Sequence, residues 1–279
     1  MSTQKQKAED FRRMHQSPPI LVLPNAWDVA SARIFASVGA SAIATSSAGV
    51  AFVLGYPDGP KIPRRLMIES IALIAASVDL PVTADVESGY GPGMTDATET
   101  AQAVIDSGAI GLNFEDATND PASPLFPVEQ QRKRLEAVRD TAERAGIPLV
   151  INARTDVYLA EVGEPSTRFA ETVRRVNAYR QSGADCLFVP GVTDGDIIQR
   201  LVREVAGPLN ILVGPGAPPI PVLESMGVRR VSVGSQICRA TLATARDAAR
   251  ELLKNGTYHG FLDRTIPYDE LNSLMAGRP

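Results

Sequence analysis

One rhythm repeats along most of the chain: a short, nearly continuous apolar run is followed by a segment with helical spacing. The apolar runs fall at residues 20–26, 42–47, 81–87, 109–116, 149–156, 186–192, 209–215 and 230–235. Runs of this kind are typical of parallel strands that are covered on both faces. The intervening segments predict helices at about 28–38, 65–78, 95–107, 128–145, 166–182, 194–205, 219–226 and 237–254.

Eight strand–helix pairs within about 235 residues predict a (β/α)8 barrel, the TIM barrel. A doubly wound nucleotide-binding fold is the competing interpretation. No apolar run leads into a Gly-x-Gly-x-x-Gly turn, which that fold would require. We find no low-complexity segment or linker, so residues 1–279 are predicted to form one α/β barrel domain with a C-terminal helical tail.

Composition argues against several classes of protein. The 28 basic and 32 acidic side chains give a net charge of −4 without a basic block, so nucleic acid is not an expected partner. The longest apolar runs fall short of the roughly 18–20 residues that a membrane helix needs, and the charged N-terminus lacks the apolar core of a secretory signal. Two cysteines cannot build a disulfide framework. We therefore expect a cytoplasmic protein.

Polar residues gather at the C-terminal ends of the expected strands, where TIM barrels carry their active sites. Asp85 and Glu87 lie two residues apart on one strand, so their side chains point the same way. Together with Glu115 from the next strand, they form an oxygen-rich set that suits Mg²⁺ or Mn²⁺. The alternative is that these are solvated carboxylates, or partners of Arg154.

Arg154 shares its strand face with Asn152 and Asp156. A guanidinium in this position can bind a substrate carboxylate through two hydrogen bonds or stabilise a developing oxyanion. A structural ion pair with Glu115 or Asp116 is the alternative, and both roles can hold together.

Ser46 and Ser47 end the second expected strand and open a turn of small residues. A serine nucleophile would need a nearby base, and neither histidine, His15 or His259, lies at a strand end. Backbone amides of this turn are therefore expected to bind a carboxylate or carbonyl oxygen, unless it is a plain turn. Trp27 either lines the pocket expected at these strand ends or packs in the core. The Pro-rich segment 117–127 forms either a lid or a static loop.

Five segments, found between about residues 15 and 255, resemble the isocitrate lyase and phosphoenolpyruvate mutase superfamily in order and spacing. They read PNAWDVASARI, TSSAGVAFVLGYPDG, PVTADVESGYG, GLNFEDA and INARTD. The resemblance implies a (β/α)8 barrel that swaps its eighth helix with a partner, in a homodimer or homotetramer. It also implies binding of Mg²⁺ and of small 2-oxo acids, with enolate-like intermediates.

Carried over by position, the resemblance implies roles for individual residues. Those expected to hold the metal, directly or through water, are Asp85, Glu87 and Glu115. Those expected to be catalytic are Asp58, Glu115 and Arg154. Those expected to contact the substrate are Trp27, Ser46, Ser47, Asp85 and Arg154.

The predicted lid differs from that of the family's carbon–carbon lyases. Those enzymes carry a Lys-Arg-Cys-Gly-His motif or a similar one with a cysteine, whereas residues 115–127 here read EDATNDPASPLFP and contain no Cys, Lys or His. The chain is therefore predicted to be a mutase-like lyase or hydrolase. It would act with Mg²⁺ on a small 2-oxo acid, such as oxaloacetate or phosphonopyruvate, through an enolate. A methylisocitrate-type lyase with an atypical lid, or a non-catalytic barrel that binds a 2-oxo acid, is the alternative.

Self-association is also expected from the C-terminal segment HGFLDRTIPYDELNSLM. Its apolar residues include Phe261, Leu262, Ile266 and Leu271, which a monomeric barrel would have little surface to cover.

Overall fold

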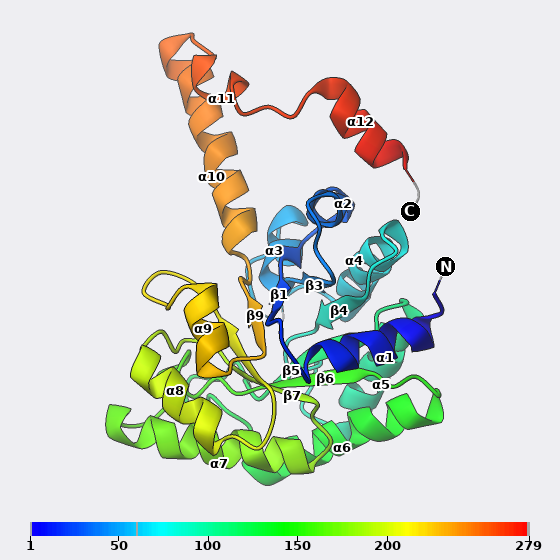
Figure 1. Cartoon of the computed structure of the whole chain (residues 1–279), viewed down its shortest axis with the longest axis vertical. Helices are drawn as coiled ribbons and strands as arrows, with labels where there is room; N and C mark the ends of the chain where they lie inside the picture. The colour runs from blue at the N-terminus through cyan, green and yellow to red at the C-terminus, as the bar shows by residue number, and fades with distance from the viewer. Residues whose placement is uncertain (1, 60, 278–279) are drawn as a thin grey trace.

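Nine parallel strand segments form one sheet that closes into a barrel in this computed structural model, which describes residues 2–59 and 61–277 (Figure 1). The strands are β1 (Leu21–Leu23), β2 (Asn25–Ala26), β3 (Ile43–Thr45), β4 (Val82–Asp85), β5 (Gly111–Glu115), β6 (Val150–Arg154), β7 (Cys186–Val189), β8 (Leu209–Leu212) and β9 (Arg230–Ser232). Only Pro24 separates β1 from β2, and β1 pairs with β9 while β2 pairs with β3. The two segments therefore act as one strand that closes an eight-stranded barrel, which confirms the predicted fold.

Helices pack around the outside of the barrel, between successive strands. They are α2 (Val29–Ser37), α4 (Arg64–Ser77), α5 (Met94–Asp106), α6 (Val128–Arg144), α7 (Pro165–Gln181), α8 (Gly195–Glu204) and α9 (Ile220–Met226). Each lies within a few residues of the range expected from the sequence. Their buried residues, such as Ile71, Leu135 and Val176, pack on the outward-facing side chains of the strands.

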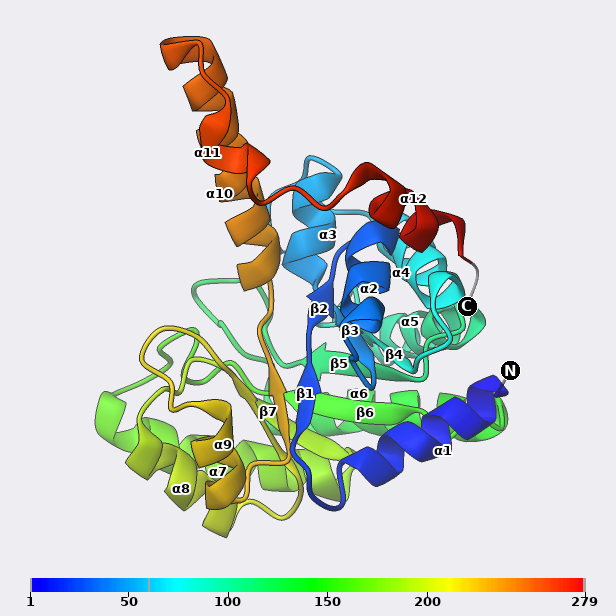
Figure 2. The same cartoon turned by 45° about the horizontal axis from the view of Figure 1, so that its top comes forward.

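Two helices were not expected. Helix α1 (Gln4–Met14) lies across the N-terminal end of the barrel, where Ala8 and Phe11 are fully buried against the strands (Figure 2). Helix α3 (Ser47–Val53) replaces the predicted turn after β3. Ser46 caps α3, because its Oγ accepts a hydrogen bond from the Gly49 amide at 3.1 Å.

The eighth expected helix, α10 (Gln236–Arg250), extends away from the barrel instead of packing on it (Figures 1 and 2). Cys238 is its one buried residue, and Leu242 is 47% exposed. A π-helical turn (Glu251–Asn255) and α11 (His259–Leu262) follow, and α12 (Tyr268–Ala276) returns to pack against α2. No helix in the described part of the chain is both long and apolar enough to cross a membrane.

The interior of the barrel contains a polar layer beneath its C-terminal end. Asn113 Oδ1 accepts hydrogen bonds from Asn152 Nδ2 at 2.7 Å and from Arg230 Nη2 at 3.2 Å. Both donors fix the orientation of the Asn113 amide, so that its Nδ2 points to Asp85. The layer next to the site is thus polar and supports the site above it, whereas Leu21, Leu23, Ile110 and Val150 form an apolar cluster with Phe11 of α1.

Candidate active site

A cavity of about 430 Å³ opens at the C-terminal ends of the strands. Its lining includes Asn25, Ser46, Ser47, Asp58, Asp85, Glu87, Asn113, Glu115, Ala117, Asn119, Arg154, Asp156, Leu159, Phe188, Leu212 and Ser232. Every residue that the sequence assigned to the metal or to catalysis lies in this one cavity. The fold therefore assembles the predicted constellation from the ends of several strands.

Asp85 is held in one orientation from three sides. Its Oδ2 accepts hydrogen bonds from the Ser47 amide at 3.0 Å and from Ser47 Oγ at 2.8 Å. Its Oδ1 accepts a hydrogen bond from Asn113 Nδ2 at 3.3 Å. Both serines of the predicted substrate-binding turn therefore have structural roles: Ser46 caps α3, and Ser47 fixes the Asp85 carboxylate.

Glu87 carries a buried carboxylate without a hydrogen-bond partner on either oxygen. Its side chain is directed by a backbone φ of +52°, which is uncommon for a residue other than glycine. Burial, followed by the charges of Asp85 and Asp58, raises the pKa of Glu87 to about 8. In the absence of a cation, this carboxyl group therefore retains its proton at neutral pH.

Arg154 lies between two carboxylates. Its Nη1 is 2.8 Å from Glu115 Oε2, and its Nε and Nη2 are 2.5 and 2.8 Å from the two oxygens of Asp156. Burial alone would lower the pKa of Arg154, but Glu115 and Asp156 raise it. Burial raises the pKa of Glu115 even though Arg154 opposes the shift. The predicted ion pair with Glu115 is present, and the second partner is Asp156 instead of Asp116.

Asp116 is a structural anchor. It is fully buried, and its carboxylate accepts hydrogen bonds from Thr155 Oγ1, the Asp156 amide, Tyr179 Oη and Arg175 Nη1 at 2.7–3.1 Å. These contacts tie the end of β5 to β6 and α7. A carboxylate bound in this way is not available as an acid in the cavity.

The predicted lid is an ordered loop closed at its base. An isolated bridge joins Ala117 to Leu125, and the Thr118 amide donates to the Pro124 carbonyl at 2.9 Å. Ala117 and Asn119 reach the cavity, whereas Asp120 is exposed on the turn. The loop thus forms part of the cavity wall without bringing a lysine, histidine or cysteine to it.

Two of the predicted site residues lie away from the centre of the cavity, Asp58 at its rim and Trp27 outside its described lining. Asp58 reaches the rim of the cavity from the loop after α3, where its Oδ1 accepts a hydrogen bond from the Gly59 amide at 2.9 Å. Trp27 is absent from the described lining. Its ring centroid lies 6.0 Å from that of Phe35, and its Cβ lies close to Gly49 behind α3. Of the two sequence interpretations for Trp27, packing matches its position.

The charges of the cavity favour a divalent cation. Five carboxylates (Asp58, Asp85, Glu87, Glu115 and Asp156) line it with a single guanidinium. Within the described residues, no three Asp, Glu, His or Cys side chains converge closely enough to hold a metal ion. Glu115, one of the predicted ligands, is paired with Arg154 at 2.8 Å. The unpartnered oxygens of Glu87, close to the charge of Asp85, fit a hard cation with oxygen ligands.

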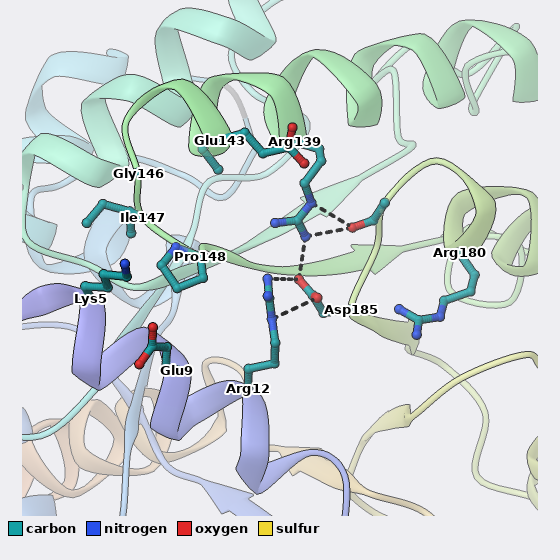
Figure 3. A pocket seen from close by; sticks show the side chains of 12 residues that line it. Lys5, Glu9, Arg12, Arg139, Glu143, Gly146, Ile147, Pro148, Arg180 and Asp185 are labelled. Atoms are coloured by element: carbon teal, nitrogen blue, oxygen red, sulfur yellow. Dashed lines mark hydrogen bonds and ion pairs between the residues drawn. The ribbon is translucent and has the colours of Figure 1, made fainter.

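A larger depression, of about 610 Å³, lies between α1 and α6 at the opposite end of the barrel (Figure 3). Three of its charged groups, those of Arg12, Arg139 and Asp185, are engaged with one another. Asp185 is 3.2 Å from Arg12 Nε and 2.5 Å from Arg139 Nη2, and Arg139 also donates to the carbonyls of Leu149 and Gly183. This end of a TIM barrel serves stability, and the contacts fasten α1 to the strands.

Sequence reasoning missed the apolar part of the cavity. Phe188 and Leu212 lie at the ends of β7 and β8, and Leu159 follows β6. These residues were passed over because the search at strand ends considered only polar side chains. A position at a strand end was the available signal for Phe188 and Leu212, but not for Leu159, which lies in the loop after β6.

Comparison with known proteins gives consistent matches. A family model described as phosphoenolpyruvate phosphomutase matches residues 11–253. An uncharacterized protein of Mycobacterium tuberculosis H37Rv is 34% identical over 265 residues, which cover 95% of each chain. Oxaloacetate decarboxylase of Pseudomonas fluorescens is 26% identical, over 86% of this chain and 82% of its own. The crystal structure of 2,3-dimethylmalate lyase superposes with a TM-score of 0.84 at 27% identity, covering 99% of this chain and 95% of the other.

Proposed function

Since the chain belongs to the phosphoenolpyruvate phosphomutase family, we propose that it is a Mg²⁺-dependent enzyme that cleaves a small 2-oxo acid through an enolate. The observation that carries this proposal is the unpartnered, buried carboxylate of Glu87 beside Asp85. Leaving two such groups together without a cation is unfavourable, and binding of a divalent ion would relieve it.

Asp85 and Glu87 would hold the ion, with Glu115 reaching it directly or through water. When bound, Mg²⁺ would polarise the oxygens of the 2-oxo acid and stabilise negative charge on the enolate. Ser47 and Asn113 keep the Asp85 carboxylate in place, so little reorganisation is needed when the cation arrives.

Arg154 would donate to the substrate oxygen on which negative charge develops. Its guanidinium remains charged because Glu115 and Asp156 flank it. Asp156 binds it through two hydrogen bonds and fixes its plane, and a substrate oxygen would share Nη1 with Glu115, which contacts that nitrogen at 2.8 Å.

Asp58 would move the proton at the reacting carbon. It lies at the rim of the cavity, and the hydrogen bond recorded for its carboxylate comes from the adjacent Gly59 amide. The loop 117–127 contains no Cys, Lys or His, and its acidic residue, Asp120, is exposed on the turn. Two of the relatives are named as a lyase and a decarboxylase, which supports cleavage of a carbon–carbon bond as the proposed reaction.

The experiment is a turnover assay on a panel of 2-oxo acids that includes oxaloacetate and phosphonopyruvate. The purified protein is assayed with Mg²⁺ and, in parallel, after treatment with EDTA, which corrects for metal-catalysed background. Asp85→Asn tests the site, and Asp106→Asn, on the exposed end of α5, serves as the matched control. We expect Mg²⁺-dependent product release that Asp85→Asn abolishes and the control retains. Equal rates with Mg²⁺ and EDTA across the panel would contradict the proposal.

A further inference from the structure

The cavity has two chemically different sides. Its carboxylates come from β4, β5 and the loop after α3. Facing them, Phe188 and Leu212 form an apolar wall at the ends of β7 and β8, and Leu159, which is 48% exposed in the loop after β6, also lines the cavity. Phe188 is 4% exposed and its ring lies 5.7 Å from the Arg154 guanidinium carbon, so it is fixed next to the group that would bind the substrate.

The cavity offers little to a second negative charge on a substrate. Among the lining residues that the structure describes, Arg154 is the single cation, and Glu115 and Asp156 already engage it. The five carboxylates and one guanidinium give 1 − 5 = −4 when all are ionised, and a bound Mg²⁺ leaves −4 + 2 = −2. In a partly buried site, like charges repel strongly. The head of a 2-oxo acid can bind the metal, but a second carboxylate or a phosphonate would lack a counter-charge.

Asn25 and Ser232, two of the neutral polar residues that line the cavity, are engaged within the protein. Asn25 Oδ1 accepts from the amides of Val233 and Gly234, both at 2.9 Å, and its Nδ2 donates to the Thr45 carbonyl at 2.9 Å. Ser232 Oγ is directed to Asn210 Oδ1 at 3.5 Å. These side chains are therefore poorly placed to receive the charged end of a substrate.

We propose that the substrate is a 4-hydroxy-2-oxo acid with a single carboxylate, and that an uncharged, apolar chain on its C4 lies on Phe188 and Leu212. When the C3–C4 bond breaks, its electron pair would stay on C3 as the enolate. The C4 fragment would leave as an aldehyde or ketone, and the hydroxyl proton would pass to a carboxylate of the cavity. This inference rests on the proposed function, because it takes the metal side of the cavity as the place of the 2-oxo acid head. A cavity of about 430 Å³ has room for such a tail. Each methylene buried on the wall should tighten binding about four-fold.

The test compares two ligands of the same size and shape. 2-Oxoglutarate and 5-methyl-2-oxohexanoate differ in that a terminal carboxylate is replaced by an isopropyl end. Titration calorimetry with the Mg²⁺-loaded protein measures both, with pyruvate as the reference for the head group. We expect 5-methyl-2-oxohexanoate to bind at least ten-fold more tightly than either of the others.

Variants of the wall give the reciprocal result. Leu212→Arg should reverse the preference by supplying a counter-charge, while Phe188→Leu, which keeps the wall apolar, should retain it. Leu73→Arg, at a position that is 64% exposed on α4, adds the same charge elsewhere and should leave the preference unchanged.

The outcomes separate this inference from the proposed function. If pyruvate binds in a Mg²⁺-dependent manner but 2-oxoglutarate binds as well as its neutral counterpart, the inference is overturned and the proposed function stands. If pyruvate does not bind, both are overturned. A preference of the wild-type protein for the neutral ligand supports the inference even if Leu212→Arg does not fold.

Discussion

Glu87→Gln should stabilise the metal-free protein, and the gain should grow with pH. In the native state, burial and the charges of Asp85 and Asp58 raise the pKa of Glu87 to about 8, whereas the ordinary value is 4.5. Between these values the native state holds a proton that the unfolded chain has released. Stability contributed by this group is therefore lost as the pH rises from about 4.5 to 8.

The magnitude follows from the two pKa values. Relative to a neutral side chain, Glu87 lowers the free energy of unfolding by about 1 kcal/mol at pH 5 and by about 4 kcal/mol at pH 8. Glutamine preserves the shape of the side chain and does not titrate. The free energy of unfolding of the variant minus that of the wild type should thus rise by about 3 kcal/mol across this range.

Urea denaturation in EDTA at pH 5, 6, 7 and 8 measures this difference. The chain has a single tryptophan, Trp27, whose fluorescence can follow unfolding. Glu143→Gln, at an exposed position on α6, is the matched control and should give no pH-dependent difference. Saturating Mg²⁺ should stabilise the wild type and have little effect on Glu87→Gln. A variant that follows the wild type in parallel at every pH would refute the placement of Glu87 in a desolvated, anionic site.

Three further outcomes are expected. Asp85→Asn should weaken Mg²⁺ binding in calorimetry at least ten-fold while circular dichroism stays unchanged; an unaltered affinity would remove Asp85 from the metal site. Light scattering at micromolar concentration should give at least the mass of a dimer, because Leu242 on α10 and Leu253 in the π-helical turn after it are exposed; a monomer mass would contradict this. Isocitrate and methylisocitrate should be poor substrates, because Asp116 is paired with Arg175 and is not free to protonate the leaving fragment. General acid catalysis of this kind is worth about 10²–10⁴-fold in rate. A kcat/KM of about 10⁴ M⁻¹s⁻¹ for release of glyoxylate or pyruvate would show this prediction to be wrong.

The barrel could be predicted because its strands are covered on both faces, which leaves near-continuous apolar runs such as 149–156. Helix α3 could not, since its small residues have no amphipathic period and only Ser46 marks its start. The local sequence also could not show that α10 extends away from the barrel, because this segment has the same amphipathic pattern as a helix that packs on a barrel.

The location of a candidate site residue could be predicted where its side-chain type and its place at a strand end were enough to identify it. Carboxylates at strand ends, such as Asp85 and Glu115, indicate their location directly. The hydrogen-bond and ion-pair partners of these residues depend on side-chain geometry across neighbouring strands, which local sequence does not determine. Arg154 therefore pairs with Asp156, while Asp116 pairs with Arg175. The same reason accounts for Ser47, which binds Asp85 through a contact that spans 38 residues.

Enolate formation on a Mg²⁺-bound 2-oxo acid defines the proposed activity, and it can be measured without knowing the leaving group. In D₂O, reversible enolisation of pyruvate exchanges its methyl hydrogens for deuterium, which proton NMR follows as loss of the methyl signal. With Mg²⁺, the loss should accelerate in proportion to the concentration of wild-type protein. It should return to the background rate with EDTA or with Asp85→Asn. A methyl signal that persists at the background rate in the presence of Mg²⁺-loaded wild-type protein would contradict the proposed enolate chemistry.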